Sequence, residues 1–231
     1  MREKVISLII LTSIAIISLY TYLYFRPGPN EFLWLFILVA WILLVIFFIA
    51  KRVERWQNFY VARKIIHILT GGVAAFLAPY IFNSPAIPLI GGLGMFALTF
   101  IPRLEGKKFD WFQVEGNWGE VWFCLTWTLV VCGFWYLDLN AGIASALFMA
   151  VGDGVTGIVR NKVYGRWSKG LAGSLAMLLV SLPIGWYYKG LPGIIASLIA
   201  TAIEKMKGVD DNITVPLISA LVMFLLPQGI G

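Results

Sequence analysis

The sequence predicts an all-α, polytopic integral membrane protein with about nine transmembrane helices and a cytoplasmic N-terminus. Of the 231 residues, 60% are hydrophobic and only 13% are charged, and the mean hydropathy is +0.84. Soluble domains are about half apolar and about a quarter charged, so the excess apolar surface must face lipid. Backbone at membrane depth has to satisfy its hydrogen bonds internally, which favours a helix for every span.

Nine apolar segments alternate with short polar connections, and the length suits a single membrane-embedded domain, residues 1–231. The segments are 5–25, 32–50, 65–82, 86–101, 119–137, 141–159, 171–188, 191–203 and 213–227. A full span needs about 20 residues, so 191–203 is a tilted helix, a re-entrant hairpin or part of a thinner region. The first segment follows Arg2 and Lys4 and has no small-residue cleavage site after it, so we expect a retained signal-anchor helix.

The positive charges set the predicted orientation. With nine spans and the N-terminus inside, the cytoplasmic pieces hold 16 of the 18 Lys and Arg residues; these pieces are residues 1–4, 51–64, 102–118, 160–170 and 204–212. Lys and Arg concentrate in the cytoplasmic loops of membrane proteins. The net charge of +6 therefore reflects topology, and we expect no nucleic-acid partner. The external connections are short, so the working face is predicted to be cytoplasmic.

The first constellation that suggests chemistry stands at the start of segment 65–82. Arg63, Lys64 and His67 are i,i+3 and i,i+4 neighbours on a helix, so one helix end offers two cations and an imidazole. Alone, this pattern is more typical of a topological anchor with a packed histidine. However, His67 is the only histidine in the chain, and it stands one turn inside an apolar helix.

Two apolar segments carry acids near their ends. At 119–137, Glu120 is a weak candidate for a polar contact, since its tryptophan neighbours are typical of a membrane interface. At 141–159, Asp153 shares a helix face with Gly157 and Arg160. Gly152 and Gly154 would let a ligand or a metal approach the backbone. Glycine, cations and a carboxylate for Mg²⁺ together suit a phosphate-binding site, although a packed helix with a capping aspartate is the alternative.

The C-terminal third adds basic and acidic groups. Lys169 precedes the start of segment 171–188, where Gly173 and Ser174 stand at a helix N-terminus, a position that favours anions. Glu204 and Asp211 would share a face if the helix continued past residue 203, and Asp210 adds a third carboxylate. Three carboxylates beside basic residues suit a divalent metal, whereas a solvated polar loop is the alternative.

Cys124 and Cys132, eight residues apart on one helix, are about 12 Å apart and cannot form a disulfide.

In their order, these motifs resemble the CTP-dependent lipid-alcohol kinases. That family includes dolichol, phytol and farnesol kinases and fungal CTP-dependent diacylglycerol kinase, and it is related to phosphatidate cytidylyltransferase. The resemblance covers about residues 60–216, after two N-terminal spans in 1–50, and rests on Arg63-Lys64-x-x-His67, Gly152-Asp153-Gly154 with Gly157 and Gly165, Lys169 to Gly173-Ser174, and Glu204 with Asp211-Asn212-x-Thr214-Val215-Pro216. Gly170 departs from the Ser or Thr that often follows the matched lysine, and Asp211-Asn212 looks like the kinase branch rather than the Asp-Arg pair of the cytidylyltransferases.

The resemblance implies a polyprenol or dolichol kinase that transfers the γ-phosphoryl group of CTP to a membrane isoprenoid alcohol at the cytoplasmic face. It implies Mg²⁺, or another divalent cation, held by Asp153 with Asp211 or Asp210. Phosphate contacts would come from the basic and small residues of the motifs, which are Arg63, Lys64, Gly152, Gly154, Gly157, Arg160, Lys169, Gly173 and Ser174. Glu204 or His67 would orient or deprotonate the alcohol, with Lys64 and Asp153 also catalytic.

Other functions stay open from the sequence. A CDP-lipid synthase or a CTP-dependent diacylglycerol kinase would use the same kinds of groups, and only the products distinguish them. A transporter would place Asp153 and Glu204 as an ion relay near the membrane midplane, whereas these acids stand at segment ends. A purely structural membrane protein leaves the clustering of acids and bases unexplained. The partners expected are CTP, a lipid alcohol and the bilayer, and association between copies is left open.

Overall fold

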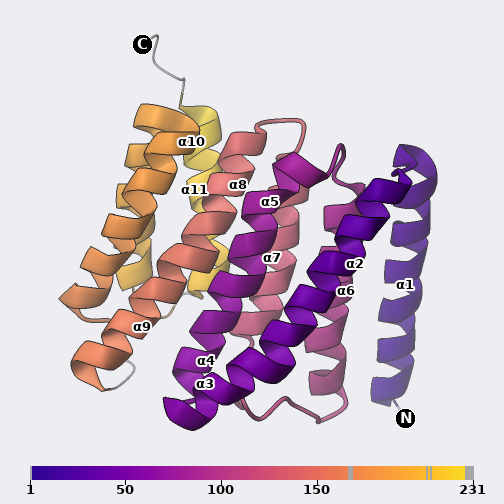
Figure 1. Ribbon diagram of the computed structural model, residues 1–231, viewed down its shortest axis with the longest axis horizontal. Coiled ribbons are helices and arrows are strands. Elements are labelled where there is room, and N and C mark those ends of the chain that lie inside the picture. Colours follow the sequence, from indigo (N-terminus) through magenta and orange to yellow (C-terminus); the bar gives the residue numbers. More distant parts are fainter. Residues whose placement is uncertain (1, 166–168, 207, 209, 227–231) are drawn as a thin grey trace.

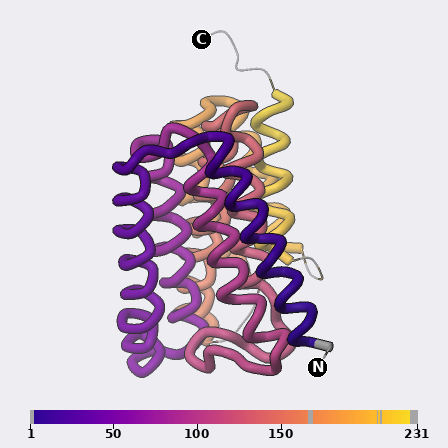
Figure 2. Tube along the Cα trace, turned by 90° about the vertical axis from the view of Figure 1, so that its right-hand side faces the viewer, coloured from indigo at the N-terminus to yellow at the C-terminus, as the bar shows by residue number. Residues whose placement is uncertain are grey.

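The structure is a computed structural model that describes residues 2–165, 169–206, 208 and 210–226. Throughout these ranges the regular structure is helical, and the helices stand side by side in one layered bundle (Figures 1 and 2). In chain order the elements are α1 (Arg2–Phe25), α2 (Pro29–Leu44), η1 (Val45–Ile49), α3 (Ala50–Trp56), α4 (Phe59–Ile66), η2 (His67–Gly72), α5 (Val73–Ile81), α6 (Ala86–Leu104), α7 (Gly119–Gly133), α8 (Leu139–Leu147), η3 (Phe148–Gly152), α9 (Asp153–Tyr164), α10 (Leu171–Lys205) and α11 (Asp211–Leu225). The all-helical prediction is therefore confirmed for the described residues.

By length and composition, six helical stretches of the described residues are long and apolar enough to cross a membrane, and the last of them contains a break at Gly190. They are Glu3–Phe25, Pro29–Trp56, Phe59–Ile81, Ala86–Leu104, Leu139–Tyr164 and Leu171–Lys205. The apolar helices α7 and α11 are shorter than a full span, with 15 residues each. The protein is thus a membrane protein with several apolar helices, whereas the count of about nine spans and the orientation of the N-terminus stay predictions.

The helix bounds differ from the predicted segments where polar residues continue a helix. Helix α4 begins at Phe59, six residues before the predicted start, because the side chain of Asn58 caps it by accepting a hydrogen bond from the Val61 amide. Helix α9 runs on to Tyr164 and ends at Gly165, which has a φ of +60°. The predicted loops 160–170 and 204–212 also contain residues 166–168, 207 and 209, which lie outside the described residues.

The element α10 consists of two helical arms that form a hairpin at Gly190. Gly190 has a φ of 56° and a ψ of −130°, a conformation that reverses the chain between the two arms. The arms then pack backbone to backbone at Gly185 and Gly193, and the Ser197 hydroxyl donates a hydrogen bond of 2.8 Å to the Ser181 carbonyl. The predicted segments 171–188 and 191–203 are therefore the two arms of one hairpin, and the second arm ends at Lys205.

Three π-helical segments interrupt the spans, and two of them border residues of interest. Segment η2 starts at His67, and η3 ends directly before Asp153. A π-helical turn shifts the backbone hydrogen bonds and leaves carbonyl groups available, and such turns are frequent at functional sites. Here indole N–H groups satisfy these carbonyls: Trp41 donates to Leu69 (2.6 Å) and Trp127 donates to Gly71 (3.0 Å), both in η2. The two aromatic residues thereby hold η2 in place.

The polar connections gather at one end of the bundle. The start of α1, the turn from α3 to α4 and the end of α9 lie at the lower end in Figure 1, opposite the end of α11. The connection between α6 and α7 joins them there in Figure 2. The predicted cytoplasmic pieces therefore lie together at this end of the bundle. At the opposite end Asp138 caps α8 by accepting from the Ala141 amide, and its other oxygen pairs with Lys189.

Candidate functional site

A polar pocket of about 230 Å³ opens at the end of the bundle where the polar connections meet. Its walls come from α4, the connection before α7, α9, the connection before α10, and the start of α11. The lining residues are Tyr60, Arg63, Lys64, Asn117, Asp153, Arg160, Lys169, Asp210, Asp211 and Asn212. The structure thus brings most of the charged residues that the sequence singled out to one place, although they are spread over about 150 positions of the chain.

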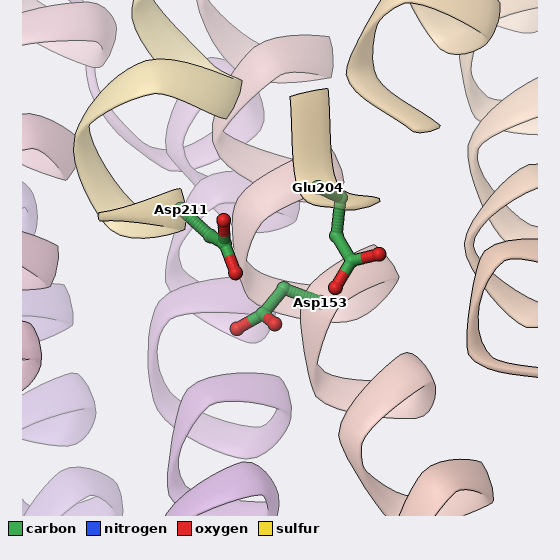
Figure 3. Close-up of side chains that lie close together, drawn as sticks. All are labelled: Asp153, Glu204 and Asp211. Atoms are coloured by element: carbon green, nitrogen blue, oxygen red, sulfur yellow. The ribbon is translucent and has the colours of Figure 1, made fainter. Parts of the chain in front are cut away.

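Three carboxylates from three different helices converge beside this pocket (Figure 3). One oxygen of each of Asp153, Glu204 and Asp211 lies within 4.8 Å of the others. Asp153 is 4% exposed and Glu204 is fully buried. Burial also raises the pKa of Asp211, at the first residue of α11, to about 7, and the nearby Asp153 carboxylate is the next cause. Converging acids of this kind repel one another, so their arrangement favours a bound cation.

Each of these carboxylates is paired with a side-chain cation. Lys64 Nζ lies 2.6 Å from Asp153 Oδ2, and Lys169 Nζ lies 2.9 Å from both oxygens of Asp211. Arg160 contacts both oxygens of Glu204, with Nη2 donating to Oε2 at 2.6 Å. Lys169 also donates to the Glu204 and Met206 carbonyls, so it joins the end of α10 to the start of α11. Buried charges of both signs are retained here because each has a partner.

The structure shows how the acids of the C-terminal third are arranged, whereas their roles at a metal stay predictions. Helix α10 ends at Lys205 and α11 starts at Asp211, so Glu204 and Asp211 approach each other from separate helices rather than along one face. Asp210 does not belong to the three-carboxylate group: its Oδ1 caps α11 by accepting from the Asn212 amide (3.0 Å) and side chain (2.9 Å). Glu204 takes the third place in the group instead, although Asp210 still lines the pocket.

Four glycines of the motifs lie against protein side chains, and their role in admitting a ligand stays a prediction. A Cβ atom on Gly157 would collide with the aliphatic stem of Lys64, and one on Gly173 would collide with Arg160. The side chain of Met177 fills the space beside Gly152, and the side chain of Ile68 in η2 fills the space beside Gly154. None of the four glycines lines the described polar pocket. They act by making room for the cations and for close packing of α9 against α4.

Replacing Gly157 with alanine is therefore expected to displace the Lys64 side chain from Asp153. Overpacking of this kind typically costs about 1–3 kcal/mol, so we expect a lower melting temperature and at least about tenfold lower turnover. The matched control is Gly133→Ala in α7, because a Cβ there meets no atom within 4 Å. Equal activity and melting temperature in the two variants would show that Lys64 does not depend on Gly157.

Sequence reasoning did not single out two residues of the pocket. Tyr60 lies one turn before Lys64, whose Nζ stands 5.7 Å from the centre of the tyrosine ring. Asn117 accepts a hydrogen bond of 3.0 Å from Arg63 Nη2. The only signal for Asn117 is its position just before the Gly119-Glu120 pair. Ser174, in contrast, does not line the pocket, and its buried hydroxyl has no hydrogen-bond partner among the described residues.

A second, apolar cavity of about 430 Å³ adjoins this pocket, and Arg63 lines both. His67 lines the apolar cavity, where its ring stacks on Phe123 with centroids 4.1 Å apart. The His67 side chain is buried, and neither ring nitrogen has a hydrogen-bond partner among the described residues; Nδ1 lies 3.7 Å from Asp153 Oδ2. Glu120 lies at the same end and pairs with Arg63 (3.6 Å) and Arg103. The charged groups thus separate a polar pocket from an apolar one.

The chain is similar to curated plant proteins named as kinases of a lipid alcohol. It is 29% identical over 202 residues to "Probable phytol kinase 1, chloroplastic" of Glycine max, covering 71% of this chain and 66% of the relative. It is 30% identical over 207 residues to "Probable phytol kinase, chloroplastic" of Zea mays, and the match covers 71% of this chain and 66% of the relative. It is 29% identical over 206 residues to the protein of the same name from Triticum aestivum, and that match covers 71% of this chain and 67% of the relative. The chain thus spans about 66% of the length of the first of these relatives. No family model and no solved structure matches the chain.

Proposed function

Because this chain belongs to the family of lipid-alcohol kinases that includes the phytol kinases, we propose that it phosphorylates a membrane isoprenoid alcohol with CTP as the donor. The observation that carries this proposal is the juxtaposition of the two pockets. The polar pocket offers Arg63, Lys64 and Lys169 to anionic groups. The adjoining apolar cavity has the right chemistry for a hydrocarbon tail, and Arg63 belongs to both walls. A phosphate donor and a lipid acceptor can therefore meet between them.

The donor set beside the polar pocket fits a divalent cation. Asp153, Glu204 and Asp211 supply carboxylate oxygens, which are the ligands that Mg²⁺ takes in phosphoryl-transfer sites. In the structure, Lys64 and Lys169 pair with two of these acids. When bound, Mg²⁺ would neutralise charge on the phosphates of CTP. Lys64 and Lys169 would then become available to contact phosphate oxygens as point charges.

We assign the proton of the alcohol to His67. In the reaction the alcohol oxygen attacks the γ-phosphorus of CTP, the bond to the β–γ bridging oxygen breaks, and CDP leaves. The hydroxyl proton has to move to a nearby base. His67 lines the apolar cavity near Asp153, and both of its ring nitrogens are unbonded among the described residues, whereas both Glu204 oxygens contact Arg160. With Nδ1 facing Asp153, Nε2 is the nitrogen that would accept the proton.

The side of the membrane follows from the charges. The polar pocket opens at the end of the bundle that carries the lysine-rich and arginine-rich connections, and such connections face the cytoplasm in membrane proteins. We therefore assign the reaction to the cytoplasmic face. Phytol is the alcohol in the names of the relatives, so phytol and similar single-chain isoprenoid alcohols come before dolichol, long polyprenols and diacylglycerol as candidate acceptors.

A matrix of nucleotides against lipid alcohols tests the proposal. Purified protein in detergent or liposomes is incubated with CTP or ATP, with Mg²⁺ or EDTA, and with phytol, geranylgeraniol, a long polyprenol or diacylglycerol. We expect a phosphorylated isoprenoid alcohol and CDP, dependence on Mg²⁺, and a preference for CTP. The products are identified by mass.

The same assay separates the alternatives. A CDP-lipid synthase would release pyrophosphate and form a CDP-lipid from phosphatidate, which is included as a further acceptor. A transporter would show gradient-driven uptake in proteoliposomes without nucleotide turnover. Either result would replace the kinase proposal, as would the absence of any phosphorylated alcohol with every donor.

A further inference from the structure

Among the described residues, the apolar cavity has exposed lining residues on two helices. It is lined by residues of α2, α4 and η2, α5, α6 and α7. Of its lining residues, three are exposed, namely Val39 and Leu43 on α2 and Gly94 on α6. Helices α2 and α6 are neighbours in the bundle (Figure 1). Their shared border therefore forms a window in the side of the bundle rather than at its polar end, and we call these three residues the lateral window.

The α6 border of the window is open because it is made of glycine. Ile87, Gly91, Gly94 and Leu98 follow one helix face and all line the cavity. A Cβ on Gly94 would meet no atom within 4 Å, and one on Gly91 would just touch Leu35 of α2 at 3.5 Å. Glycine weakens a helix interior by about 1 kcal/mol relative to alanine. Here it leaves a gap between two helices that larger side chains would close.

The inner end of the cavity is polar, whereas its length is apolar. The hydroxyl groups of Thr70 and Thr99 are bonded to carbonyls of their own helices, so they leave the wall apolar. The charged and imidazole side chains in the cavity wall are those of Arg63, His67 and Glu120, at the end of the cavity beside the polar pocket. Along α6 the lining extends from Ile87 to Thr99, about 18 Å at ~1.5 Å per residue. A molecule with one long apolar chain and one polar end matches this shape.

We propose that the lateral window admits a single-chain isoprenoid alcohol from the bilayer, whose tail fills the apolar cavity while its hydroxyl group reaches His67. This inference rests on the proposed function and adds the binding site and the access route of the acceptor. The unbonded ring nitrogens of His67 provide the partner that a buried hydroxyl group needs. We expect diacylglycerol, which has two chains, to bind this single cavity less well than an alcohol with one chain.

Closing the window tests the route. Gly94→Leu places a side chain in open space, so the helix is expected to fold at least as well as the original. We expect kcat/KM for phytol and geranylgeraniol to fall at least about tenfold, since even one methylene in such a pocket changes it by about 10–200-fold. The KM for CTP should stay unchanged, because the polar pocket is untouched. Gly133→Leu on α7 is the matched control, since its Cβ position is also open and lies outside the cavity.

A binding measurement without turnover locates the tail. A farnesol analogue with a diazirine at the end distant from the hydroxyl group is photo-crosslinked to the full chain, and the labelled peptides are mapped by mass spectrometry. We expect labels on α2, α5, α6 or α7, at residues that line the cavity, and loss of most labelling in Gly94→Leu. Competition by phytol should reduce the labelling, and competition by diacylglycerol should not.

The two measurements separate this inference from the proposed function. Labelling of the cavity without any phosphorylated product would support the site and overturn the kinase activity. Phosphorylation of phytol with equal kcat/KM in the wild type, Gly94→Leu and Gly133→Leu, together with labels confined to outer faces such as α1 or α10, would overturn the window and the cavity while leaving the activity intact.

Discussion

Replacing Asp153 with asparagine is expected to lower phosphoryl transfer by at least about 10³-fold while the protein still folds. The carboxylate lies at the centre of the three-acid group and is buried against Lys64. Asparagine has the same shape, and its side-chain oxygen can still accept from Lys64, so the packing is kept. What is lost is the negative charge that a divalent cation requires, and metal stabilisation of the transferring phosphoryl group is worth several kcal/mol.

A matched control separates this loss from a general effect of removing a buried acid. Asp138→Asn also removes a carboxylate paired with a lysine, Lys189, but at the opposite end of the bundle. Turnover of CTP with phytol, its dependence on Mg²⁺ concentration and the melting temperature are measured for both variants. The expected pattern is similar melting temperatures, near-normal turnover for Asp138→Asn, and almost none for Asp153→Asn. Near-full activity of Asp153→Asn would refute the assignment of Asp153 to the metal.

Hydropathy and charge were sufficient to predict where the chain is helical and which ends of the helices carry polar groups. Apolar segments have to be helical in a bilayer, and lysines and arginines collect on one side of it. Residues from the ends of several segments were therefore expected on one face, and the structure places Arg63, Lys64, Asp153, Lys169 and Asp211 around one pocket. Their chemical roles stay predictions.

The differences between the expected and the observed surroundings of these residues have a common physical cause, because a sequence does not show what fills the space around a residue. The space beside a glycine that lies near a lysine can hold a ligand or the aliphatic part of the lysine side chain. At Gly157 the aliphatic part of Lys64 fills that space. Helix α10 ends at Lys205 and Asp210 caps α11 after the break, and it is Glu204, near the end of α10, that lies beside Asp153 and Asp211. The apolar cavity depends on five neighbouring stretches of helix, so no local pattern could indicate it.

Glutamine at position 204 is expected to cause the largest loss of stability, and a double replacement separates that loss from function. Arg160 is 2% exposed and Glu204 is fully buried, so Glu204→Gln leaves a buried cation without its carboxylate. Removal of one member of a buried pair costs about 3–5 kcal/mol, so we expect the melting temperature to fall by roughly ten degrees or more. Differential scanning fluorimetry in detergent provides the measurement.

Replacing both members with leucine removes the unpaired charge, and exchange of a buried ion pair for apolar side chains is often neutral or stabilising. In Arg160→Leu/Glu204→Leu we therefore expect the melting temperature to return to near the wild-type value. Activity should stay at least about 10²-fold low, because the third carboxylate for the cation is still missing and Arg160 no longer lines the polar pocket. If activity returned together with stability, Glu204 would act only by holding α9 against α10, and the cation would be held by Asp153 and Asp211 without it. A stable double variant with low activity that rises only at a higher Mg²⁺ concentration than the wild type needs would instead place Glu204 at the metal.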